Sequence, residues 1–328
     1  MEQANNGSGA PSGATRRTVI KGAAWSVPVI AAAVAVPMAA ASGGVIIESA
    51  AATLSGDVCD VLGEFSFTVK AVTGGTPAKD RGVIVTLPEG FTWGDGESGS
   101  KTLTTDSSGV ITIDGVTSGT KPGTYLITAQ VVGDTASTSI VVAIAGVWIE
   151  ARQGYGGTGV FPVYMSAPAD GTAPDPDGWA YCIEHNVDAE TGIAARAGDT
   201  SSYLGGNNFK DDAVVQGRVL WVLAHSYPTL SLEDFGTAAG VPGISRNDAI
   251  EATQYAIWRY TDLSYDASWD WETDESKDAY WYLVNGANAV DATALPPSGT
   301  VISVPTAPCT TPTADDHAQS LVLAAPSL

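Results

Sequence analysis

One cysteine of this chain lies in a segment where its thiol could do chemistry. The 328-residue sequence contains three cysteines, and Cys182 ends the strand-like run Gly-Trp-Ala-Tyr-Cys at 178–182. A thiolate is a strong nucleophile that can attack an acyl carbon, although a buried cysteine can equally be inert packing. An odd number of cysteines leaves one thiol outside any internal disulfide, and an unpaired thiol in an exported protein needs a reason.

A glutamine interrupts the apolar face of a predicted helix further along the chain. Within residues 248–260, Ile250, Ile257 and Trp258 recur at helical spacing, and Gln254 lies midway between Ile250 and Trp258. Burying a carboxamide without partners costs about 1–3 kcal/mol. Most buried polar groups find backbone partners. Gln254 is therefore either a satisfied core glutamine or an acyl group with a chemical role.

Together the two segments resemble the signature of the thioester domains of Gram-positive surface adhesins. Cys182 is preceded by the aromatic Tyr181 and followed by the apolar Ile183. The second motif of that family is Thr-Gln-x-Ala-(Ile/Val)-Trp. It is matched at every specified position by Thr253, Gln254, Ala256, Ile257 and Trp258. The resemblance covers residues 148–305 and implies an internal thioester between Cys182 and Gln254.

The implied thioester would make the protein a single-turnover covalent binder rather than an enzyme. The Cys182 thiolate displaces ammonia from the Gln254 carboxamide, and a fixed geometry supplies the effective molarity. A lysine amine on a host or neighbouring-cell surface protein then attacks the acyl carbon and forms an amide. We expect no cofactor and no metal ion.

Other residues near the two motifs could assist this chemistry. Aromatic walls such as Tyr181 and Trp258 would keep water from the thioester. His185 or His225 could act as a base, although isolated histidines are more often surface or capping residues.

Residues 148–305 have the mixed pattern of an α+β domain, which the resemblance describes as a β-sandwich with a helical insertion. Two strands and then three helices are predicted. They lie at 146–152, 158–165, 211–226, 245–260 and 274–286. Ser245 followed by Asp248 is typical of a helix N-terminus. Residues 306–328, rich in Pro, Thr and Ala, are predicted to be an extended tail.

The preceding region, residues 45–146, has the pattern of an all-β sandwich. Short strand-like segments alternate with Gly and Pro turn signals. The continuously apolar segments 83–87 and 125–129 predict strands covered on both faces. The region resembles the immunoglobulin-like spacer modules of bacterial surface proteins. It contains no asparagine, which excludes an internal Lys–Asn isopeptide bond. A Lys–Asp bond stays open, although Lys70 is more simply a surface residue of a strand.

Residues 1–41 resemble a twin-arginine signal peptide. Arg16 and Arg17, a spacer, two apolar residues and Lys21 precede an uncharged Ala/Val-rich run that ends in small residues. The alternative is a membrane anchor. We expect removal of the signal and an exported mature chain without a membrane span. The net charge of −21 argues against nucleic-acid binding, because phosphates would be repelled.

With Cys182 assigned, Cys59 and Cys309 remain as an even pair that could form a disulfide in an exported protein. Such a bond would tie the predicted tail back to the sandwich. The order of the two domains and the lack of a sortase motif depart from the adhesin pattern, so the mode of anchoring stays open.

Three alternatives to the thioester interpretation differ in the residues that they need. A cysteine protease lacks its family surroundings here, and a metal site at Cys182 and His185 lacks two further ligands. A noncovalent carbohydrate- or protein-binding module would use exposed aromatic side chains. Its candidates, which could equally be core residues, are Trp269, Trp271 and Trp281.

Overall fold

The structure is a computed structural model that describes residues 44–262, 265, 271–291 and 299–324. The predicted signal peptide, residues 1–41, lies outside the described residues. Within the described part of the chain, no helix combines the length and apolar character that a membrane span requires.

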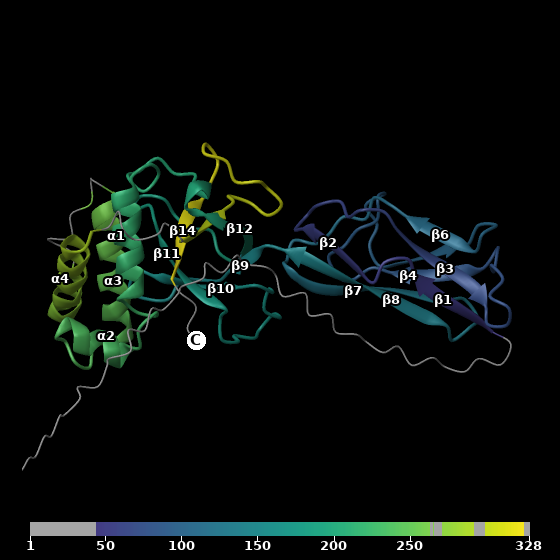
Figure 1. Cartoon of the computed structure of the whole chain (residues 1–328), viewed down its shortest axis with the longest axis horizontal. Helices are drawn as coiled ribbons and strands as arrows, with labels where there is room; N and C mark the ends of the chain where they lie inside the picture. Colours follow the sequence, from purple (N-terminus) through teal and green to yellow (C-terminus); the bar gives the residue numbers. More distant parts are fainter. Residues whose placement is uncertain (1–43, 263–264, 266–270, 292–298, 325–328) are drawn as a thin grey trace, which may run out of the picture. The chain divides into compact units, whose positions relative to one another are not determined.

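The region from Val45 to Ala145 consists of eight strands in two sheets (Figure 1). The first sheet has the order β1 (Val45–Ser49), β3 (Phe65–Ala71), β6 (Val110–Ile113). The second has the order β2 (Thr53–Asp57), β8 (Ser137–Ala145), β7 (Gly123–Val131), β4 (Gly82–Thr86), β5 (Ser100–Thr104). Side chains of both sheets form one apolar core, as two packed layers require. The immunoglobulin-like assignment stays a prediction.

Two strands of this region are not covered on both faces, so that prediction was wrong. Along β4 and β7, buried and exposed residues alternate, and Ile84 and Leu126 are 36% and 46% exposed. The second sheet is antiparallel except for the parallel pair of β2 and β8. It presents one face to the core and the other to solvent, as antiparallel strands commonly do. An apolar run alone does not distinguish this arrangement from a strand buried on both faces.

The remaining strands close into a six-stranded barrel. Around the barrel the order is β9 (Val147–Ile149), β10 (Val160–Tyr164), β11 (Gly178–Cys182), β14 (Gln319–Ala324), β13 (Thr300–Val304), β12 (Ile193–Asp199). The barrel interior is filled by small and branched apolar side chains, among them Val163, Ala180 and Leu321. Closure leaves none of these strands with an open edge.

The last strand of the barrel corrects the predicted tail. Residues 319–324, expected to be part of an extended tail, form β14, which pairs with both β11 and β13. All six residues are buried. The domain therefore continues beyond residue 305 to Ala324. Because both faces of β14 are covered, its sequence lacks the alternation that marks a half-buried strand.

Between β12 and β13, the described residues form four α-helices that lie together beside the barrel (Figure 1). They are α1 (Ala213–Ala224), α2 (Leu232–Ala239), α3 (Arg246–Thr261) and α4 (Asp274–Ala289). Ser245 caps α3 as predicted, since its hydroxyl accepts the Asp248 N–H at 3.1 Å. Helix α2 was not predicted. It has only eight residues, between the Ser231 cap and Gly240 in the left-handed conformation.

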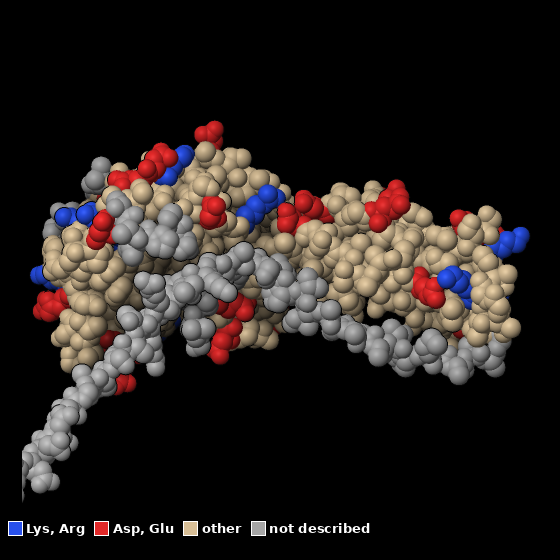
Figure 2. Space-filling view, viewed as in Figure 1, with Lys and Arg blue, Asp and Glu red and all other residues tan. Residues whose placement is uncertain are grey.

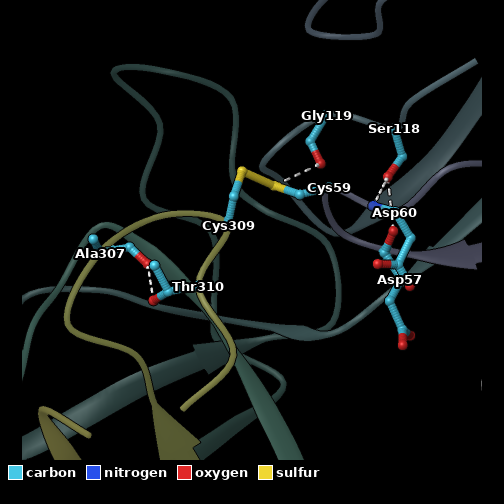
Figure 3. The surroundings of a disulfide bond; sticks show 8 residues. All are labelled: Asp57, Cys59, Asp60, Ser118, Gly119, Ala307, Cys309 and Thr310. Carbon is cyan, nitrogen blue, oxygen red and sulfur yellow. Dashed lines mark hydrogen bonds between the residues drawn. A yellow bond between two sulfur atoms is a disulfide. The ribbon is translucent and has the colours of Figure 1, made fainter. Parts of the chain in front are cut away.

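Cys59 and Cys309 are joined by a disulfide bond in the structure (Figure 3). Their Cα atoms are 5.4 Å apart, and 250 residues separate them in the sequence. Both residues have a positive φ, 62° and 64°, which is uncommon for residues other than glycine. Cys59 lies just after β2 and Cys309 lies between β13 and β14.

Candidate functional site

Cys182 is the last residue of β11 and lies where two apolar cores meet. Successive side chains of a strand point to opposite faces. Tyr181 accordingly belongs to the core shared with the helices, whereas Ala180 belongs to the barrel interior. The Cys182 side chain contacts both cores. The thiol is therefore held between the end of the barrel and the helical layer.

Gln254 lies in the middle of α3 and is fully buried. Its carboxamide makes two hydrogen bonds, both with the backbone of Cys182. The Cys182 N–H donates to Gln254 Oε1 at 3.0 Å, and Gln254 Nε2 donates to the Cys182 carbonyl oxygen at 2.9 Å. The partners that a buried glutamine needs are thus supplied by the cysteine, and they fix the acyl group beside residue 182.

The electrostatic surroundings of Cys182 keep its thiol protonated at neutral pH. Burial raises the pKa of the Cys182 thiol to about 12, because a low-dielectric site disfavours the charged thiolate. Arg152 acts in the opposite direction, and the carboxylates of Glu184 and Asp188 add to the increase. A reaction of Cys182 as a nucleophile therefore needs a group that accepts its proton.

A pocket of about 310 Å³ opens at Cys182. Its lining combines apolar and charged residues. They are Ala151, Arg152, Gly157, Phe161, Cys182, His185, Val187, Asp188, Ala189, Thr191 and Trp258. Trp258, which is 4% exposed, forms an apolar wall. A molecule that enters this pocket reaches Cys182 and Trp258 of α3, whereas the fully buried Gln254 is not among the lining residues.

The structure separates the two histidines that were candidate bases. His185 lines the pocket, its ring lies 4.8 Å from that of Trp258, and its backbone N–H donates to Asp262 Oδ2 at 3.1 Å. His225 ends α1 instead. Its ring stacks on Trp221 at 3.9 Å and its Nδ1 lies 2.8 Å from the Trp221 carbonyl oxygen. His225 is not among the residues that line the pocket.

The other residues of the two motifs support the site from within the core. The Tyr181 hydroxyl donates to the Tyr227 carbonyl oxygen at 2.8 Å, and the Thr253 hydroxyl donates to the Ala249 carbonyl oxygen at 2.7 Å. Burial raises the pKa of Tyr181, so this phenol stays neutral. The remaining motif side chains are fully buried. They are Ile183, Ala256 and Ile257.

Sequence reasoning missed the loop between β9 and β10, which supplies Arg152 and Gly157 to the pocket. The Tyr155 hydroxyl ties this loop to α3 by donating to Asp248 Oδ1 at 3.0 Å. Gly154 has a φ of +138°, and a Cβ there would lie 2.9 Å from the Thr158 carbonyl oxygen. The only available signal was the density of glycines at 154–159, which indicates close backbone approach.

The two described tryptophans of the alternative, noncovalent interpretation, Trp271 and Trp281, differ in their surroundings. Trp271 packs against Tyr255 and Tyr280, with ring centroids 5.1 and 4.9 Å apart. Trp281 is 44% exposed, and Trp269 lies outside the described residues. Among the described residues, no group of three or more His, Cys, Asp or Glu side chains is placed to hold a metal ion.

The segment that carries Cys182 and Gln254 is similar to a known protein family. Residues 179–289 match the family model described as "Thioester domain". The chain contains a thioester domain. The matched segment includes both Cys182 and Gln254, together with all four helices, whereas β14 lies beyond it.

The solved structures that are similar to this chain include two of one bacterial domain. One is the N-terminal thioester domain of a surface protein from Clostridium perfringens, at 16% identity and a TM-score of 0.34, covering 54% of this chain and 95% of that chain. The other is a cysteine-to-alanine mutant of that domain, at 16% identity and a TM-score of 0.28. The match covers 60% of this chain and 86% of that chain. No curated protein gave a match.

Proposed function

We propose that the thioester domain joins Cys182 to Gln254 and uses the thioester to capture an amine, so that the protein acts as a covalent adhesin. The observation that carries the proposal is the pair of hydrogen bonds between the Gln254 carboxamide and the Cys182 backbone. A core glutamine could find such partners anywhere in the fold, but here they belong to the one cysteine outside a disulfide.

The first step is formation of the thioester. Cys182 Sγ attacks Cδ of Gln254, the Cδ–Nε2 bond breaks, and the thiol proton leaves with the amide nitrogen as ammonia. The Cys182 N–H, 3.0 Å from Oε1, donates to the oxygen on which negative charge develops. The hydrogen bond from Nε2 to the Cys182 carbonyl oxygen orients the leaving group before the attack.

The second step consumes the thioester. A primary amine, such as that of a lysine side chain, attacks the same carbon, the Cδ–Sγ bond breaks, and an amide forms. His185 accepts the proton of the amine and returns it to the departing Cys182 sulfur, so that a neutral thiol is released. The buried wall formed by Trp258 limits the access of water, which would otherwise hydrolyse the thioester.

The intact mass of the purified mature protein tests the first step. We expect a mass lower by one ammonia than the sequence requires, and the full mass in Cys182→Ala and in Gln254→Ala. Gln130→Ala, which changes a glutamine on the exposed face of β7, is the matched control and keeps the loss. A full mass in fresh wild-type protein would reject the thioester and favour the noncovalent interpretation.

Reaction with methylamine tests the second step and the role of His185. We expect one methylamine adduct on the wild-type protein and none on the two variants that lack the thioester. His185→Gln should slow the reaction, whereas His225→Gln should leave its rate unchanged because that ring contacts its own helix. Equal slowing by both substitutions would argue against His185 as the base.

We further propose that the protein is exported by its N-terminal signal and presented at the cell surface. The basic segment and apolar run of residues 1–41 and the disulfide between Cys59 and Cys309 support this, since disulfides persist outside the cytosol. N-terminal sequencing of protein recovered from the cell surface or medium tests it. We expect a start near residue 42, and recovery only from the cytosol would contradict the proposal.

A further inference from the structure

Two opposite charges without partners line the pocket at Cys182. Arg152 comes from the loop after β9 and Asp188 from the segment after β11. Neither side chain has an ion pair or a hydrogen bond within the described part of the chain. Because both lie near Cys182, they act on its thiol with opposite sign. The pocket thus offers one cation and one anion to whatever enters it.

Arg152 has no acidic partner among the described residues, and the ion pairs between those residues are all made by lysines or by a histidine. The chain has 36 Asp and Glu against 15 Lys and Arg, and acidic side chains are spread over the face seen in Figure 2. The stem of Arg152 passes close to the backbone of Gly159, where a Cβ would lie only 2.9 Å from Arg152 Cδ. Arg152 is exposed, so its guanidinium is open to a ligand that enters the pocket.

We propose that the pocket selects a lysine side chain that has an aspartate or glutamate next to it in a polypeptide. Asp188 receives the lysine ammonium as it approaches, and Arg152 pairs with the neighbouring carboxylate. The apolar walls formed by Phe161, Val187 and Trp258 accept the lysine methylenes. This inference rests on the proposed function and names the amine-bearing segment that the thioester captures.

Arg152 and Asp188 act while the lysine-bearing segment binds, before the covalent step, and take no part in the bonds that form and break. The lysine ammonium releases one proton to solvent and its nitrogen bonds to Cδ of Gln254. The Cδ–Sγ bond breaks, and a second proton from the nitrogen passes to the departing Cys182 sulfur, which leaves as a thiol. Opposite charges at an exposed site contribute modestly, about threefold in rate for each pair, and salt screens the effect. The selection should therefore be measurable and should decrease at high ionic strength.

Blocked peptides that differ in one position test the proposal. Three peptides present Lys-Glu, Lys-Gln and Lys-Arg, and the rate of adduct formation is followed by intact mass. With wild-type protein we expect Lys-Glu to react about three times faster than Lys-Gln and Lys-Arg to react more slowly. Arg152→Gln should remove this order. Asp188→Asn should slow all three peptides while keeping their order.

Two exposed residues elsewhere provide matched controls, Arg196→Gln and Asp175→Asn, and both should behave as wild type. Equal rates for the three peptides with wild-type protein, or an unchanged order in Arg152→Gln, would overturn the inference. Methylamine separates this result from a failure of the proposed function. A wild-type protein that loses ammonia and takes methylamine has a working thioester, whatever its selectivity.

Discussion

Replacing the buried carboxamide by a carboxylate should make the stability of the thioester domain depend on pH. Hydrolysis of the proposed thioester would leave a glutamate at position 254, so Gln254→Glu reproduces that state. The comparison is made in Cys182→Ala protein, where no thioester forms and the backbone partners of residue 254 remain. The only difference between the two proteins is then an amide or a carboxyl group at a fully buried position.

The structure sets the sign and size of the effect. A charged carboxylate at 254 would face the Cys182 carbonyl oxygen, which is 2.9 Å from Nε2 of the native glutamine. A protonated carboxyl can donate to that oxygen instead. Full burial raises the pKa of a carboxyl by about 3–5 units, from about 4.3 in the unfolded chain. The folded protein then holds a proton that the unfolded chain releases, so the unfolding free energy falls as pH rises.

Between pH 5 and pH 7 this linkage amounts to a loss of about 2.5 kcal/mol. Urea unfolding followed by tryptophan fluorescence measures it, since most tryptophans lie in the thioester domain. At pH 4 the two proteins should be about equally stable. Gln130→Glu in the same Cys182→Ala protein is the control and should show no such loss. If the unfolding free energies of the proteins with Gln and with Glu at position 254 change with pH in the same way, residue 254 is not buried as the structure shows.

Three further predictions concern the elements that hold the site. Tyr155→Phe removes the hydrogen bond to Asp248, about 1 kcal/mol, and should speed thioester hydrolysis severalfold, measured by intact mass; an unchanged rate would show that the loop does not shield the site. Truncation after residue 305 removes β14 and its pairing with β11, so the truncated protein should retain its ammonia; normal thioester formation would contradict a closed barrel. Replacing Cys59 and Cys309 by serine should lower the unfolding free energy by at most about 5 kcal/mol under nonreducing conditions, and the urea midpoint should fall accordingly. An unchanged midpoint, or two free thiols in addition to Cys182 in native wild-type protein, would argue against the bond.

Much of the local structure followed from the sequence because its signals are short-range. The helices α1, α3 and α4 were predicted near their observed bounds, and the cap of α3 was read from Ser245 and Asp248. Helix α2 was missed because eight residues show too little periodicity. The exposed faces of β4 and β7 were missed because an apolar run does not say how many layers cover a strand.

The residues that carry the proposed chemistry were also found in the sequence alone. Cys182 stood out because of its neighbours and because the total number of cysteines is odd. Gln254 stood out as a polar residue on the apolar face of a helix. Each signal is local and depends on residue type. The sequence could not state that the Cys182 backbone is what satisfies the Gln254 carboxamide, because that contact joins a strand and a helix far apart in the chain.

The tertiary structure alone decided what surrounds this pair. It placed β14 beside the strand of Cys182, and it brought Arg152 and Asp188 to one pocket while leaving His225 on its own helix. None of these relations has a local signature, because strand pairing and pocket lining depend on how distant segments meet when the barrel closes. The sequence therefore determined which two side chains could react. The fold decided which elements position them, which side chains cover them and which residues line the pocket beside them.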